Sequence, residues 1–145
     1  VFSMIPGLEN AEFVRYGVMH QNTFLQSPRL LDKYYADRRN PLVAFAGQMT
    51  GVEGYVESTA SGYLAAVAMA AKLQGREVPD FPKETAIGAL GQYVSDESIE
   101  NFQPMNINFS IIAPLEKRIR KKAEKNLAIA ARSLDVIDAL AAKGI

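Results

Sequence analysis

A short apolar run followed at once by a glycine-rich turn is the feature that most constrains the fold of this chain. Residues 42–46, LVAFA, are five consecutive apolar positions after the turn signal Asn40-Pro41. Such a run is typical of a central parallel strand that is covered on both faces. The alanine-rich sequence from residue 51 to residue 73 is helical in character and ends before Gly75. Strand, turn and helix in this order predict an α/β fold.

The turn itself contains Gly47, Gly51 and Gly54. This spacing differs from the G-x-G-x-x-G fingerprint of dinucleotide-binding proteins, and no lysine follows the last glycine as it would in a P-loop. Thr50 and Glu53 fit the capping box, so the helix is expected to begin at Gly51 with Thr50 as its N-cap. The backbone amides of residues 51–53 would then form the positive end of the helix.

Two interpretations of this turn stay open. In the first, the amides at the helix start face an electron-rich or anionic group of a ligand. In the second, the glycines serve packing alone. Glu53 also has two possible roles. It is a structural capping partner, or it turns outward as a carboxylate that accepts hydrogen bonds from an amino-pyrimidine ring.

Composition narrows the classes of function. The 145 residues are 48% hydrophobic, which is enough for one domain core. The 16 basic and 16 acidic residues cancel, so overall charge drives no nucleic-acid or membrane partner, although a local patch could act. The absence of cysteine excludes disulfides, thiolate metal sites and thiol nucleophiles, and it suits the cytoplasm. No cluster of histidine and carboxylates has metal-ligand spacing, so we expect no metal site.

The remaining elements follow from local patterns. Residues 14–19 and 23–26 are expected to be extended, 83–94 a short helix weakened by two glycines, and 96–112 irregular. The uncharged stretch 58–71 is shorter than the roughly 20 residues of a membrane crossing, so no membrane partner is expected. A long helix is expected from Pro114 to Lys143. Its core-facing stripe would comprise Ile119, Ala123, Leu127, Ala130, Leu134, Ile137 and Ala141.

Six cationic residues gather at the start of this helix, opposite the stripe. They are Lys117, Arg118, Arg120, Lys121, Lys122 and Lys125. They form a solvated face or a contact for RNA phosphates, and no interleaved aromatic residue supports base stacking. His20 and Asn22 are the remaining polar candidates, each a structural residue or a ligand contact.

Several segments together resemble a known family. They are MIPGLENAEFVRYGVMHQNTFLQSPRLL, FAGQMTGVEGYVESTASG, FPKETAIGALGQYV and NFQPMNINF, which span nearly the whole chain. They are similar to the C-terminal part of the folate- and FAD-dependent tRNA (uracil-5-)-methyltransferases, flavoproteins of the glucose-inhibited-division class. The block FAGQ-TGVEGY-ES carries most of the specificity.

The resemblance implies an activity, cofactors and site residues. Such an enzyme takes a one-carbon unit from methylenetetrahydrofolate, reduces it through FAD with electrons from NAD(P)H, and methylates carbon 5 of a T-loop uridine in tRNA. It implies a strand-turn-helix beside the flavin ring, with Glu53 contacting the folate pterin and His20 and Asn22 as further folate candidates. The candidate flavin contacts are Gly47, Gln48, Met49, Thr50, Gly51, Val52, Glu53 and Gly54.

The departures from the family pattern set the expected domain organisation. The chain lacks the family's G-x-G-x-x-G segment and its catalytic cysteines, so it reads as a piece of a longer protein. Residues 1–21 would return from an inserted substrate domain, 22–75 would end a Rossmann-like FAD-binding domain, and 76–145 would be a helical tail packed on it. The missing N-terminal part would be its partner, and an interrupted sheet edge leaves self-association open. The alternative is a stand-alone helical adaptor that binds RNA through the basic residues.

The isolated chain is expected to be colourless and inactive, with no cofactor bound, because the segment that holds the ADP half of FAD is absent from it. Absorption spectroscopy of the purified chain, together with a tRNA methylation assay, checks this. A flavin absorption band that survives purification would contradict the expectation.

Overall fold

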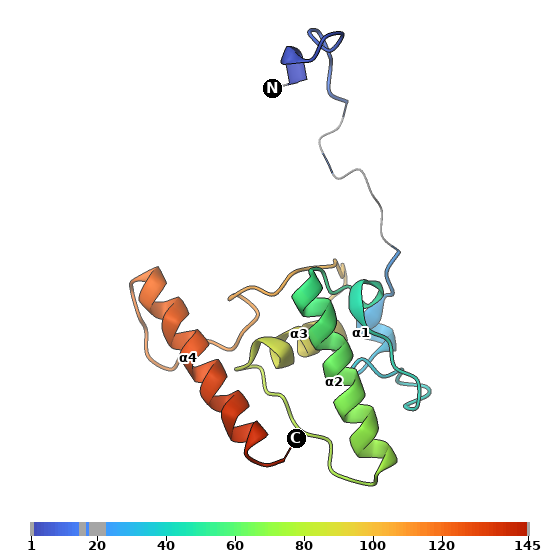
Figure 1. Cartoon of the computed structure of the whole chain (residues 1–145), viewed down its shortest axis with the longest axis vertical. Helices are drawn as coiled ribbons and strands as arrows, with labels where there is room; N and C mark the ends of the chain where they lie inside the picture. The colour runs from blue at the N-terminus through green and yellow to red at the C-terminus, as the bar shows by residue number, and fades with distance from the viewer. Residues whose placement is uncertain (1, 15–16, 18–22, 145) are drawn as a thin grey trace.

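The computed structural model describes residues 2–14, 17 and 23–144. Its elements are η1 (Phe2–Met4), α1 (Ser27–Leu30), η2 (Gly47–Thr50), α2 (Tyr55–Leu73), α3 (Ala86–Ser95) and α4 (Lys122–Ala141). Figure 1 shows α3 between the two long helices α2 and α4. In the described part of the chain, no helix is long and apolar enough to cross a membrane.

The core forms where α1, α2 and α3 meet. Leu64 of α2 and Leu90 and Val94 of α3 are buried together with Leu31 and Phe102. The buried face of α2 recurs every three or four residues and comprises Ser61, Leu64, Ala65, Ala68 and Ala71. The small side chains on this face allow a close neighbour, which is the helix α3.

The prediction of a central parallel strand at residues 42–46 is wrong for this structure. The turn at Asn40-Pro41 folds the segment back, antiparallel, on residues 35–37. The Asp37 N–H donates to the Val43 carbonyl at 2.8 Å, and the Phe45 N–H donates to the Tyr35 carbonyl at 3.0 Å. Leu42 is 67% exposed, so this segment is not covered on both faces.

The described residues contain isolated bridges and no extended sheet. The bridges join Leu31 to Asp37, Ala36 to Ala44 and, in parallel, Val52 to Met105. The segment 23–26 is not a strand either, although the Leu25 N–H donates to the Met49 carbonyl at 2.8 Å. A Rossmann-like arrangement therefore stays a prediction, as do the domain boundaries at residues 21 and 75.

The short helix predicted at 83–94 is confirmed as α3. Thr85 is its N-cap: the buried hydroxyl accepts a hydrogen bond from the Gly88 N–H at 3.1 Å and donates to the Pro82 carbonyl at 2.8 Å. Gly88 and Gly91 were expected to weaken this helix. The structure gives them a role, because α3 lies so close to other backbone segments that a Cβ atom at either position would overlap a carbonyl oxygen.

The last helix differs from its prediction in start and in face. α4 begins at Lys122, because the chain from Pro114 to Lys121 runs alongside the helix before entering it. The Arg132 guanidinium donates to the carbonyls of Ala113 and Pro114 and fixes that segment. Ile129 is the buried residue of α4, whereas Leu127, on the predicted core stripe, is 71% exposed. The helix packs through a face turned away from Leu127 and Leu134, although Ile137 of the predicted stripe does pack against the core.

Gly88→Ala is expected to lower the free energy of unfolding by about 2 kcal/mol or more. Its Cβ would lie 2.3 Å from the carbonyl oxygens of Phe81 and Pro82. Gly62→Ala is the matched control, because a Cβ there meets nothing closer than 3.8 Å and should stabilise α2 by about 0.5–1 kcal/mol. Urea unfolding measures both, and equal midpoints for the two variants would contradict the close approach.

Candidate functional site

The glycine turn of residues 47–54 has the backbone that only glycine adopts readily. Gly47, Gly51 and Gly54 have φ values of 72°, 85° and 96°. Gly47 opens η2 and Gly51 closes it, with the Gly51 N–H donating to the Gln48 carbonyl at 3.0 Å. The Thr50 hydroxyl donates to the Gly47 carbonyl at 2.8 Å. The glycine bend predicted from the sequence is therefore confirmed.

The predicted capping box is wrong. α2 begins at Tyr55, and its N-cap is Gly54, which offers no side chain. Thr50 is buried inside the turn, where its carbonyl accepts from the Ser27 hydroxyl at 2.9 Å. The positive φ at Gly51 and Gly54 cannot continue an α-helix, so residues 51–53 instead pair with Met105.

Two of the amides that were expected to face a ligand are hydrogen-bonded within the protein instead. The Gly51 N–H is taken by Gln48, and the Glu53 N–H donates to the Met105 carbonyl at 3.0 Å. The amides left without an intrahelical partner belong to the first turn of α2. The residues of this turn are open to solvent, since Tyr55 is 96% and Val56 is 78% exposed.

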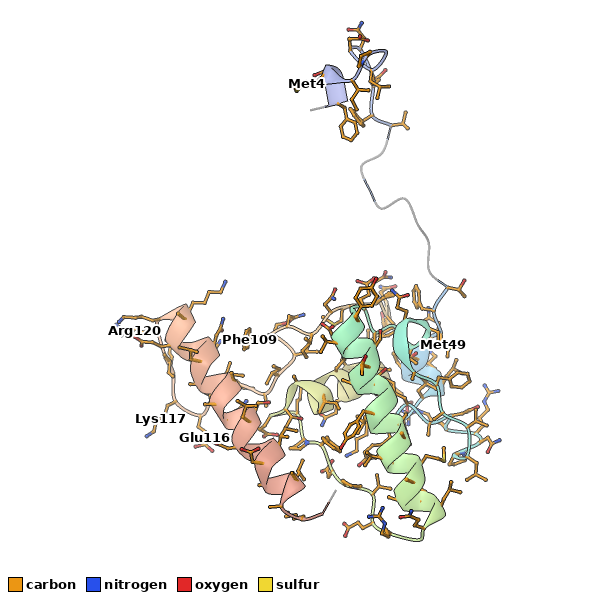
Figure 2. All side chains as sticks on the ribbon, viewed as in Figure 1. Met4, Met49, Phe109, Glu116, Lys117 and Arg120 are labelled. Carbon is orange, nitrogen blue, oxygen red and sulfur yellow. The ribbon has the colours of Figure 1, made fainter. Side chains whose placement is uncertain are left out.

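Exposed side chains of both polar and apolar kinds lie in the turn that precedes this helix start. η2 packs against the first turns of α2, where the Gly47 N–H donates to the Ser61 hydroxyl at 2.8 Å. Met49 is exposed beside the N-terminal end of α2, as Figure 2 shows. Gln48 and Glu53 are exposed as well. We call Gln48, Met49, Glu53, Tyr55 and Val56 the turn surface.

One side chain closes part of the helix start. Glu57, in the first turn of α2, accepts a hydrogen bond from the Ile107 N–H at 3.4 Å. A Cβ atom on Gly54 would lie 2.2 Å from its carboxylate and 2.8 Å from the Asn106 amide nitrogen. Asn106 and Glu57 therefore border the turn surface on the side of residues 105–107.

The six predicted cationic residues do not share one helical face. Lys117, Arg118, Arg120 and Lys121 lie in the segment before α4, and Lys122 and Lys125 lie in its first turns. Lys121 is paired with Glu124 at 3.0 Å. Four of the other five, all except Lys117, line a shallow hollow of about 560 Å³. We call it the basic hollow, lined by Phe109, Arg118, Arg120, Lys122, Lys125 and Asn126.

Phe109 is the residue that sequence reasoning missed. It is 45% exposed and lies on the segment that passes beside α4, whereas Arg120 comes from the segment leading into the helix (Figure 2). The only sequence signal was the aromatic end of the NFQPMNINF block, nine residues before Arg118. Only the fold brings this ring to the cations.

Two candidate ligand contacts, His20 and Asn22, lie outside the described residues. Among the residues that the structure describes, no group of three or more histidine and carboxylate side chains could hold a metal ion.

Comparisons with known proteins agree with the resemblance seen in the turn. Residues 1–77 match the family model described as glucose inhibited division protein A. The chain is also similar to proteins named methylenetetrahydrofolate–tRNA-(uracil-5-)-methyltransferase TrmFO. The relative from Acetivibrio thermocellus is 56% identical over 137 residues, which cover 94% of this chain and 31% of that protein. The relative from Natranaerobius thermophilus is 60% identical over 125 residues, covering 86% and 29%.

A third relative, from Streptococcus agalactiae, carries the same name and is 58% identical over 135 residues, covering 92% of this chain and 30% of that protein. The chain thus spans about a third of the length of these curated relatives. The family match covers more than half of the chain. The chain belongs to the glucose-inhibited division protein A family.

Gly51→Ala is expected to destabilise the turn by about 2–4 kcal/mol. The added Cβ would lie 2.4 Å from the buried Phe102 ring, at a positive φ of 85°. Gly75→Ala is the control, because Gly75 has a similar φ of 65° and a Cβ atom there would have no neighbour within 4 Å. This variant should therefore show only the backbone cost of about 1 kcal/mol. Thermal or urea unfolding compares them, and a Gly51→Ala loss no larger than that of the control would refute the ring contact.

Proposed function

We propose that this chain is the flavin-facing part of a folate- and FAD-dependent tRNA (uracil-5-)-methyltransferase. The names of its relatives support the reaction, and the family match supports the flavoprotein class. The observation that carries the proposal is the open helix start at Tyr55 and Val56, directly after a turn built from three glycines.

The turn surface fits the chemistry of a flavin ring. An isoalloxazine has a flat apolar body and a pyrimidine edge whose carbonyl gathers negative charge when the ring is reduced. Met49 and Val56 offer exposed apolar atoms to the body. The N-terminus of α2, a helix of 19 residues, offers amides and positive potential to the edge. When bound, FAD would supply the electrons that reduce the one-carbon unit.

Each candidate residue then has a proposed role in this chain. Gly47, Thr50, Gly51, Val52 and Gly54 shape the turn, and Gln48 and Met49 contact the ribityl chain or the ring edge. The exposed Glu53 carboxylate is the proposed partner of the folate pterin, with His20 and Asn22 as further folate contacts. The cysteine chemistry of the reaction is assigned to other parts of the longer protein, since this chain has no cysteine.

tRNA is the proposed macromolecular substrate, and NAD(P)H the proposed source of electrons. The basic residues of the segment 117–125 would contact tRNA phosphates. The basic hollow also favours a second candidate function, an RNA-binding adaptor in which the glycine turn is architecture alone. The two candidates differ in one respect that is easily measured, because only the first requires the turn surface to hold a flavin.

Val56→Asp in the full-length protein tests the flavin assignment. A carboxylate in the first turn of a helix is favourable for the helix itself, so the melting temperature should hold. The same charge opposes the electron-rich flavin edge, so FAD should be retained about tenfold more weakly, as measured by flavin absorbance per protein during dialysis.

Ala66→Asp is the matched control, since it adds the same charge to an exposed position about 15 Å further along α2. It should keep FAD at the wild-type ratio. If Val56→Asp also keeps FAD at that ratio, the flavin does not face the start of α2 and the adaptor is favoured.

A further inference from the structure

The basic hollow places cations where the backbone is already positive. Lys122 and Lys125 lie in the first turns of α4, and Arg118 and Arg120 lie in the segment just before it. The N-terminus of a helix carries about half a positive elementary charge, so each nearby cation is unfavourable there. The N-cap, Lys121, makes no capping hydrogen bond with its side chain, and the first-turn carboxylate of Glu124 is paired with the Lys121 ammonium at 3.0 Å. The arrangement favours an anion in front of the helix.

The cations of the hollow are available to such an anion. The ion pairs found in the described part of the chain involve Lys33, Arg38, Lys72 and Lys121, and none of these four residues lines the hollow. No carboxylate lines it either, as far as the structure describes the chain. Four positively charged side chains therefore line the hollow, and no acidic side chain of the hollow neutralises their charge.

Both walls of the hollow are anchored to the protein interior. On one side, Ile112 is buried against Ile129 of α4 and holds the segment that carries Phe109. On the other side, the Arg132 guanidinium donates to the Pro114 carbonyl at 2.8 Å and holds the segment that carries Arg118 and Arg120. The ring and the cations are thus presented from fixed segments.

We propose that the basic hollow binds one unstacked nucleotide of an RNA strand, with its base against the Phe109 ring and the flanking phosphates on the cations. Single-stranded nucleic-acid sites combine these two parts, a positively charged groove and an exposed aromatic ring. Asn126, half-buried beside them, has an amide that can pair with a base edge. RNA loops are recognised through bases splayed onto aromatic side chains. That the RNA is tRNA rests on the proposed function.

An acidic protein partner is the competing occupant, and the aromatic ring separates the two. An acidic peptide would need the cations and gain little from a flat apolar ring. Tenfold weaker RNA binding is therefore expected for Phe109→Leu, which keeps an apolar side chain and removes the stacking face. Phe109→Tyr keeps the face and should restore binding.

The test uses the full-length protein and a fluorescent, unmodified tRNA transcript, with binding measured by anisotropy at several salt concentrations. Phe109→Leu should weaken binding without changing the salt dependence, because no charge is removed. Lys125→Gln should weaken binding and reduce the salt slope by roughly one. Arg39→Gln, an exposed cation outside the hollow, should change neither.

Several outcomes would overturn the assignment. One is unaltered tRNA affinity in Phe109→Leu when the wild-type protein binds tRNA. Another is a competition experiment in which polyglutamate, which stands for an acidic protein partner, displaces the tRNA transcript as effectively as a single-stranded oligoribonucleotide does. Flavin content and melting temperature of the same samples exclude misfolding. A wild-type protein that retains FAD but binds no tRNA would also contradict the proposed substrate, whereas loss of flavin retention alone leaves the RNA test intact.

Discussion

The contact between the buried Phe102 ring and Gly51 joins the glycine turn to the core. The ring occupies the space where any other residue at position 51 would carry its Cβ, and it also contacts Phe24 and Tyr93 at centroid distances of 6.2 and 5.5 Å. Next to it, the Glu53 and Met105 amides donate to the carbonyls of Met105 and Gly51. These contacts hold the turn at residues 47–54 against a segment fifty residues later in the chain.

The same connection relates the two candidate sites. The segment that pairs with Val52 at Met105 continues to Ile107, whose amide donates to Glu57 at the start of α2. Two residues later it presents Phe109 to the basic hollow. One irregular segment thus borders the proposed flavin surface at one end and the proposed nucleotide site at the other.

The sequence predicted the local chemistry better than the long-range contacts. The three glycines predicted a bend, and α3 was predicted within a few residues, because these patterns depend on neighbours in the chain. The apolar run at 42–46 was mistaken for a buried strand, since apolarity does not say which segment pairs with it. The Thr50–Glu53 box failed because two positive φ angles outweighed a capping pattern. Phe109 was missed because no sequence spacing links it to the cations. The start of α4 was predicted too early, at Pro114, whose carbonyl is instead bound by Arg132.

The proposed flavin site requires the amides at the start of α2 to face the flavin. Hydrogen–deuterium exchange on the full-length protein, with FAD removed and then restored, tests it most directly. We expect the amides of Tyr55 and Val56 to exchange more slowly with FAD present, while those around Gly75 at the far end of α2 are unchanged. Exchange at Tyr55 and Val56 that is the same with and without bound FAD would contradict it.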